Sequence, residues 1–134
     1  MGEVEQPRLV SVQTYCDERG VLSVLDAPSL PFACQRLYWI SKPTVDAVRG
    51  NHGHYRLEQV LLALQGEFTL EVWNKAQSAV FEVVCGGPGV YIPPGWLRRL
   101  SNFEAGTLAL VAASQPYDPR DYFTDETQND AADE

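Results

Sequence analysis

The stretch Arg49-Gly-Asn-His-Gly-His-Tyr-Arg-Leu-Glu-Gln-Val-Leu-Leu-Ala-Leu-Gln-Gly66 contains both histidines of the chain, His52 and His54. Residues two apart on a strand point to the same face, so a strand here would direct both imidazoles, and Arg56 after them, to one spot. The apolar run 60–64 follows and ends in Gln-Gly, as a buried strand closed by a turn does. The stretch therefore predicts a polar cluster joined directly to core structure.

Short alternating segments lie on both sides of this stretch. Gly, Pro, Asn and Asp turns separate them at intervals of about 8 to 12 residues, which is typical of strands in a sandwich or barrel. Besides the histidine strand, the expected strands cover residues 9–15, 21–25, 34–40, 60–64, 67–73, 79–84, 90–92, 97–100 and 107–113, and the first two form a hairpin. Because no segment has a convincing helical period, the sequence predicts an all-β fold.

The length and composition indicate one domain. The chain has 134 residues, of which 45% are hydrophobic, so it can bury a core without disulfides. We expect a flexible N-terminus over residues 1–8, a folded domain over 9–123 and an acidic, disordered tail over 124–134, with the aromatic residues after Gln115 packing on the body. The widely spaced Cys16, Cys34 and Cys85 predict reduced core thiols.

The charge excludes some classes of partner. A formal net charge of −8, most of it in the C-terminal segment, argues against binding to nucleic acid or to an anionic membrane. The chain also lacks an apolar run long enough to cross a bilayer and a signal peptide at its N-terminus. We therefore expect a cytoplasmic protein.

A metal site is the first of three explanations for the histidine pair. Many small β-barrels present two imidazoles to a metal in this way, but further ligands are then needed. The chain has no third histidine, and Glu58 or Gln59 would be the natural supplement. Arg98 stands where another ligand is expected, and a guanidinium group cannot ligate a cation.

Acid–base catalysis without a metal is the second explanation, because histidine titrates near neutral pH. Tyr38 shares a predicted strand face with Arg36 and would donate a hydrogen bond to a developing enolate. Arginines within or beside the same strands suit an anionic substrate, best a diphosphate: Arg36, Arg49, Arg56, Arg98 and Arg99.

The third explanation treats both histidines as ordinary surface or core residues. The tryptophans have a similar alternative. Trp96, beside a Pro-Pro-Gly turn, is the best candidate for stacking on a ligand, although packing is the commoner role of a tryptophan.

The motif Arg49-Gly-Asn-His-Gly-His54, followed by an apolar strand and Gly66, resembles the Arg-Gly-x-His-x-His signature of the sugar-nucleotide 3,4-ketoisomerases. Supporting segments occur in order along the chain: Asp17-Glu-Arg-Gly20, Arg36-Leu-Tyr-Trp-Ile40, Tyr91-Ile-Pro-Pro94 and Ala113-Ser-Gln-Pro-Tyr-Asp-Pro-Arg-Asp-Tyr122. The resemblance implies a single-domain cupin-type double-stranded β-helix, or jelly roll. It also implies a homodimer that uses no metal or other cofactor.

The resemblance further implies an isomerase that converts dTDP-4-keto-6-deoxyglucose to its 3-keto isomer, on the way to 3-amino-3,6-dideoxy sugars. His52, His54 and Tyr38 are then catalytic. His52 removes the proton from C3, His54 relays or delivers it, and Tyr38 lies near the sugar oxygens. The implied substrate-binding residues are Arg36, Arg49, Arg56, Gln59, Arg98 and Trp96. A histidine often follows the tryptophan in this family, so the arginines after Trp96 bear on the configuration at C4 of the product.

Three alternatives remain open. They are a dTDP-sugar epimerase of the same fold, a metal-dependent cupin enzyme and a non-catalytic domain that binds sugar nucleotides. Epimerases of this fold pair a histidine with an acidic residue, and the sequence offers no evident aspartate partner for His52 or His54.

Overall fold

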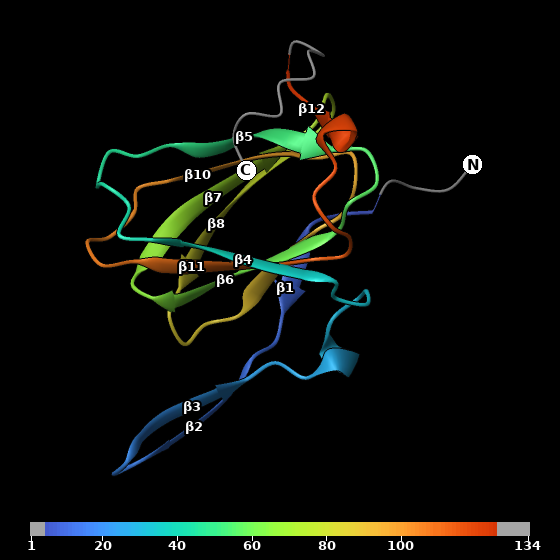
Figure 1. The fold of residues 1–134 in the computed structure, drawn as a ribbon. Helices are drawn as coiled ribbons and strands as arrows, with labels where there is room; N and C mark the ends of the chain where they lie inside the picture. Colours follow the sequence, from blue (N-terminus) through green and yellow to red (C-terminus); the bar gives the residue numbers. More distant parts are fainter. Residues whose placement is uncertain (1–4, 126–134) are drawn as a thin grey trace.

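Two five-stranded antiparallel sheets face each other in the computed structural model, which describes residues 5–125 (Figure 1). The first sheet has the order β1 (Arg8–Val10), β9 (Gly89–Ile92), β6 (Gln59–Gln65), β11 (Leu108–Ala113) and β4 (Arg36–Ser41). The second has the order β12 (Tyr122–Phe123), β5 (Arg49–His54), β10 (Leu97–Ser101), β7 (Glu67–Trp73) and β8 (Ser78–Val84). These elements confirm the predicted all-β fold. Of the predicted tail, residues 126–134 lie outside the described residues.

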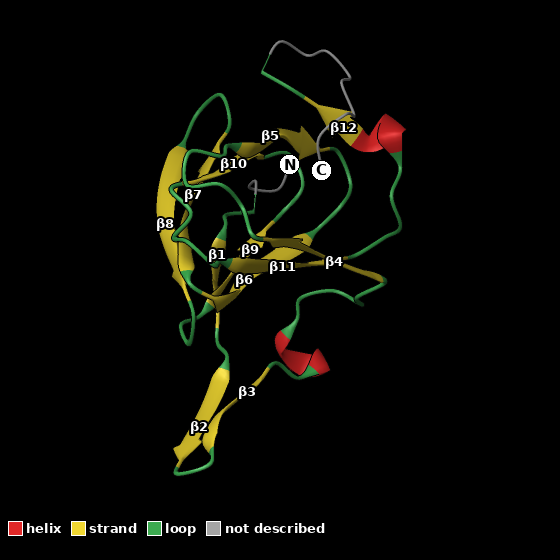
Figure 2. Cartoon of the chain, turned by 60° about the vertical axis from the view of Figure 1, so that its left-hand side comes forward, coloured by secondary structure: helices red, strands yellow, loops and turns green. Residues whose placement is uncertain are grey.

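A separate hairpin, β2 (Gln13–Asp17) and β3 (Gly20–Val24), projects away from the two sheets (Figure 2). The sequence predicted this hairpin, but it joined β1 and β2 into one strand over residues 9–15. In the structure β1 pairs with β9 and β2 pairs with β3. The remaining elements are two short 3-10 helices, η1 (Ala27–Ser29) and η2 (Pro119–Asp121).

Strand β6 is buried on both faces, which explains its continuous apolar run. Leu61 and Ala63 belong to the core between the sheets, together with Leu70 and Leu100 from the second sheet. Val60 and Leu62 face the other way, into a smaller cluster with Val10 and Tyr91. The sheet that contains β6 therefore packs across the core from the sheet that contains β5, the histidine strand.

The prediction of buried thiols is wrong, because all three cysteines are free and exposed. Cys16 lies on the projecting hairpin, whereas Cys34 and Cys85 lie just before β4 and just after β8. Apolar neighbours in the sequence did not imply burial, because these positions are at the edges of the fold. No helix among residues 5–125 is long and apolar enough to span a bilayer.

Candidate active site

A β-bulge at the start of β5 sets the direction of the motif side chains. His52 lies opposite Arg98 and Arg49 lies opposite Leu100, so β5 uses one residue more than β10 between these two pairs. Gly50 has a φ of 75°, a conformation that glycine adopts without steric cost. Residues directly opposite each other in an antiparallel pair point to the same side, and Leu100 belongs to the core between the sheets. Arg49 therefore shares the interior face with His52 although the two are three residues apart.

The two imidazoles lie side by side inside the barrel. His52 and His54 are only 2% and 4% exposed, and their ring centroids are 5.0 Å apart at an interplanar angle of 86°. The ring of Tyr122, from β12, contacts both of them at centroid distances of 4.6 Å and 4.5 Å. The predicted convergence of the histidines is confirmed, and Tyr122 is a neighbour that sequence reasoning missed.

Arg98 connects the histidines to the opposite sheet. Its Nη2 donates a hydrogen bond of 2.9 Å to Tyr38 Oη and lies 3.5 Å from His52 Nε2. On β4, the guanidinium of Arg36 lies 4.6 Å from the centroid of the Tyr38 ring. The structure thus brings together Tyr38, Arg36, Arg98 and His52; the strand alternation predicted the common face of Arg36 and Tyr38.

Burial keeps both imidazoles neutral. Together with the charge of Arg98 and the neighbouring His54, it lowers the pKa of His52 to about 2. Burial, again with the help of Arg98, lowers the pKa of His54 to about 3; the main-chain carbonyl of Asp121 acts in the opposite direction, because it can accept from a ring N–H. A neutral imidazole is the form that can accept a proton.

Several buried polar atoms of this interior have no hydrogen-bond partner in the described part of the chain. They include His52 Nδ1, Gln59 Oε1 and Arg98 Nε; His54 Nδ1 also has no hydrogen bond among the described residues and lies 3.6 Å from Asp121 Oδ2. Gln59 is 1% exposed and alternates along β6 with residues of the outer cluster, so it belongs to the interior face. Buried polar atoms in proteins are nearly always paired, and these atoms are therefore suited to bind the oxygens of a ligand.

Asp121 accompanies His54, so the expectation that neither histidine has an acidic partner is wrong. Asp121 Oδ2 lies 3.6 Å from His54 Nδ1, and the carboxylate side chain is 1% exposed. Asp121 lies far from the histidines in sequence, at the end of η2. The only available signal was the segment around Tyr117, which carried the family resemblance but no assigned role.

Two predicted arginines lie outside this interior. Strand β5 ends at His54, so the alternation does not continue to Arg56, whose side chain is 67% exposed and pairs with Asp118 at 3.0 Å. The prediction that Arg56 shares the histidine face is therefore wrong. Arg99 points to the outer face of the second sheet, where it bonds Glu71 at 2.9 Å.

Trp96 is packed in the core instead of facing a ligand. It is 2% exposed, and its indole Nε1 donates a hydrogen bond of 2.9 Å to the carbonyl of Glu5. The structure thus favours packing, the commoner role of a tryptophan, over stacking on a substrate.

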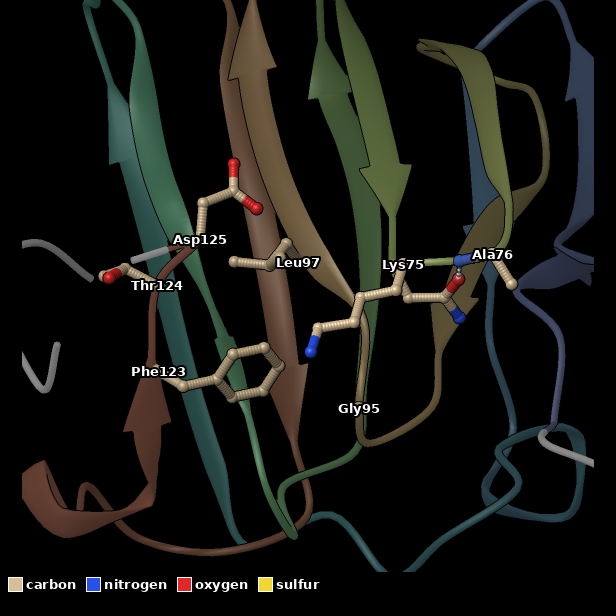
Figure 3. A pocket seen from close by; sticks show the side chains of 8 residues that line it. Lys75, Ala76, Gly95, Leu97, Phe123, Thr124 and Asp125 are labelled. Carbon is tan, nitrogen blue, oxygen red and sulfur yellow. Dashed lines mark hydrogen bonds between the residues drawn. The ribbon is translucent and has the colours of Figure 1, made fainter. Parts of the chain in front are cut away.

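A surface hollow of about 400 Å³ lies on the outer face of the second sheet (Figure 3). It is lined by Leu97 and Phe123, which alternate along their strands with the inward-facing Arg98 and Tyr122, and by the side chain of Lys75. The hollow is therefore on the other side of the sheet from the imidazoles.

The donor set does not suit a metal ion. Within residues 5–125, no three His, Cys, Asp or Glu side chains come together as ligands. The guanidinium of Arg98 lies beside His52 Nε2, and its charge would repel a bound cation.

The family follows from comparison with known proteins. A family model described as FdtA: WxcM-like, C-terminal, matches residues 5–132. The chain belongs to this FdtA family. A curated relative, the TDP-4-oxo-6-deoxy-alpha-D-glucose-3,4-oxoisomerase of Aneurinibacillus thermoaerophilus, is 29% identical over 118 residues, which cover 86% of this chain and 84% of the relative.

Solved structures show the same relationship. A mutant of the 3,4-ketoisomerase QdtA from Thermoanaerobacterium thermosaccharolyticum, in complex with TDP-4-keto-6-deoxyglucose, is 29% identical, with a TM-score of 0.86 over 92% of this chain and 91% of QdtA. The TDP-quinovose 3,4-ketoisomerase WlaRB from Campylobacter jejuni is 27% identical, with a TM-score of 0.83 over 92% and 95% of the two chains. These matches confirm the predicted family and its cupin-type β-fold.

Proposed function

We propose that the protein is an isomerase that converts TDP-4-keto-6-deoxyglucose to its 3-keto isomer by proton transfer through an enediolate. The observation that carries this proposal is a pair of neutral imidazoles facing Tyr38 and the buried Arg98 inside the barrel. The names of the relatives, which are 3,4-ketoisomerases or oxoisomerases of TDP-sugars, support the same reaction.

The chemistry needs only proton transfer. The hydrogen at C3 is acidic because it is adjacent to the C4 ketone. His52 accepts this proton, and the C–H electron pair forms the C3–C4 double bond of an enediolate while the negative charge moves to the oxygen on C4. A proton then adds to C4, the proton of the hydroxyl on C3 passes to the oxygen on C4, and the ketone is left at C3. Since the oxidation at C3 balances the reduction at C4, no external oxidant, reductant or cofactor is required.

Tyr38 and Arg98 are suited to stabilise the enediolate. Tyr38 Oη accepts a hydrogen bond from Arg98, so its own hydrogen is available to a sugar oxygen. Arg36 and Arg49, also on interior strand faces, are the proposed partners of the diphosphate, and Gln59 contributes a buried amide. Arg56 and Trp96 are left out of this site because they are ion-paired at the surface and packed in the core.

We also propose a homodimer, formed by the outer face of the first sheet and the projecting hairpin. Large apolar side chains are exposed there, including Leu22 at 61% and Trp39 at 62%. Between the hairpin and the sheet lies a groove of about 460 Å³, lined by residues such as Val21, Leu37 and Leu110. A two-stranded hairpin is only marginally stable alone, so a second copy packed against it would stabilise it. The proposed setting is the cytoplasm, in the synthesis of 3-amino-3,6-dideoxy sugars.

Incubation with TDP-4-keto-6-deoxyglucose in deuterated water tests the reaction. The expected product, identified by NMR, has its ketone at C3 and solvent deuterium at C4. The absence of both isomerisation and deuterium uptake would refute the proposal.

The same experiment separates the rivals. The sequence-based argument against an epimerase was the lack of an acidic partner for the histidines, and Asp121 removes it. The position of the deuterium and of the ketone must therefore decide: an epimerase would invert a deuterated carbon and leave the ketone at C4. A metal-dependent enzyme would lose its activity with a chelator and regain it with metal. A binding domain would hold the TDP-sugar without any hydrogen exchange.

A further inference from the structure

The two imidazoles have neighbours of opposite charge. His52 Nε2 faces the guanidinium of Arg98 at 3.5 Å, whereas His54 Nδ1 faces the carboxylate of Asp121 at 3.6 Å. An adjacent cation disfavours an imidazolium, and an adjacent anion favours it. The two rings are therefore not equivalent as places to hold a proton.

The carboxylate of Asp121 is fixed at the edge of the His54 ring. Its Oδ1 accepts a hydrogen bond of 2.9 Å from the main-chain N–H of Arg56, and its Oδ2 accepts one of 3.0 Å from that of Leu57. The side-chain amide of Gln115 adds a third contact, at 3.3 Å. These bonds tie η2 to the turn after β5, so the carboxylate cannot leave the imidazole without breaking them.

The two residues after Asp121 pack on β5, Tyr122 on its inner face and Phe123 on its outer face. Strand β12 pairs with β5, with Tyr122 opposite His54 and Phe123 opposite Gly53 (Figure 1). The Tyr122 ring contacts both imidazoles in the interior. Phe123 covers the outer side so closely that a Cβ on Gly53 would lie 2.6 Å from its ring. The C-terminal segment therefore fixes the orientation of His54.

We propose that Asp121 is a positioning residue that makes His54 the resting place of the proton taken from the sugar. This inference rests on the proposed isomerase function. With Nδ1 directed at the carboxylate, His54 carries its hydrogen on Nδ1 and presents the lone pair of Nε2. The proton leaves C3 for His52 and moves to the adjacent His54, where Asp121 stabilises the imidazolium. The imidazolium exchanges its proton with solvent and then delivers a proton to C4, so that in deuterated water a deuteron reaches C4. The bonding electrons stay on the sugar throughout.

The groups around His54 act on its pKa in opposite directions. Arg98 on β10 and Arg36 on β4 lower the pKa of His54, and His52 is the adjacent ring on β5. The main-chain carbonyl of Asp121 opposes that lowering, and no such acceptor is among the causes that act on His52. The carboxylate of Asp121, 3.6 Å from Nδ1, is the one anion paired with either imidazole in the described part of the chain.

The first test compares Asp121→Asn with Asp118→Asn. Asp118 is the N-cap of the same short helix and binds Arg56 and Arg120, but its ion pairs involve neither imidazole. We expect Asp121→Asn to lower kcat by about 100-fold with little change in KM, and Asp118→Asn to keep the wild-type rate. Thermal unfolding and TDP binding check that both variants are folded. Equal rates for Asp121→Asn and the wild type would overturn the proposal.

Two further measurements distinguish positioning from a merely structural role. In a His54→Gln background, Asp121→Asn should cause no additional loss of kcat, whereas a structural role would cause the same loss in both backgrounds. Nitrogen-15 NMR of the histidines should show the Nδ1–H tautomer at His54 in the wild type and a shift toward Nε2–H in Asp121→Asn. This readout needs no turnover, so it decides the role of Asp121 even if the isomerase reaction fails. An Nε2–H tautomer in the wild type would refute the proposal.

Discussion

Arg98 lies directly opposite His52 in the pairing of β10 with β5, and its Nη2 is 3.5 Å from His52 Nε2. The same nitrogen donates a hydrogen bond to Tyr38 Oη. One buried guanidinium, 1% exposed, therefore connects an imidazole of one sheet to a phenol of the other. Its charge would repel a cation beside His52 Nε2 and, after burial, helps to keep that imidazole neutral.

Replacing Arg98 by methionine tests this arrangement. We expect kcat/KM to fall by about 100-fold or more, because the enediolate loses a buried cation and Tyr38 loses its donor. The pKa of His52 should rise, since the charge of Arg98 is one cause of its lowering. Isomerisation rates and an NMR titration of His52 measure these effects. Arg99→Met, on the outer face of the same strand, is the matched control and should keep the wild-type rate; an equal loss in both variants would contradict the prediction.

Gly50→Ala tests the bulge that aligns Arg49 with the histidines. Both Gly50 and Gly106 have positive φ, so alanine at either should cost about 1 to 2 kcal/mol of unfolding free energy. Only at Gly50 would the new Cβ approach Arg98, at 3.3 Å from Nη1, whereas at Gly106 it meets no atom within 4 Å. Urea unfolding should therefore show similar losses in both variants, while the isomerisation rate should fall only in Gly50→Ala. Normal activity of Gly50→Ala would mean that the bulge does not position the site.

The part of this site that was predictable from sequence follows the two-residue period of strands. His52 with His54, and Arg36 with Tyr38, lie on common faces because β5 and β4 are regular where these residues occur. The same rule failed at Arg56, because it was extended beyond the end of β5.

The two-residue period could not predict that Asp121 and Tyr122, near the C-terminus, contact the histidines. Strand β12 has only two residues, too few for any alternation, so nothing in the sequence aligned Tyr122 with the histidines. The contact between Asp121 and His54 depends on that pairing, because it joins residues that are distant in the chain. The exposed cysteines show the same limit: apolar neighbours indicate a strand, but not which face of it is covered.

The buried histidines predict a loss of stability in acid. The pKa values of His52 and His54 in the folded protein, about 2 and about 3, lie below the ordinary histidine value of 6.5. The unfolded chain therefore binds more protons between these limits. The contribution of each histidine to stability is full above about pH 6.5 and is lost as the pH falls toward the folded-state pKa, by up to about 1.4 kcal/mol per pH unit. Urea unfolding between pH 7 and pH 5 measures the slope, which should be smaller in His52→Asn; an unchanged slope would contradict the prediction.

Charged substitutions on the outer face of the first sheet test the homodimer. Trp39 on β4 and Val80 on β8 are both 62% exposed, but they lie on different sheets, and only Trp39 is on the proposed interface. Burying a glutamate without a partner costs several kcal/mol, so Trp39→Glu should dissociate the dimer while Val80→Glu should not. Sedimentation velocity at micromolar concentration should give twice the chain mass for the wild type and for Val80→Glu, and a single chain for Trp39→Glu. A monomeric wild type, or a dimeric Trp39→Glu, would show that these exposed apolar residues do not join two copies.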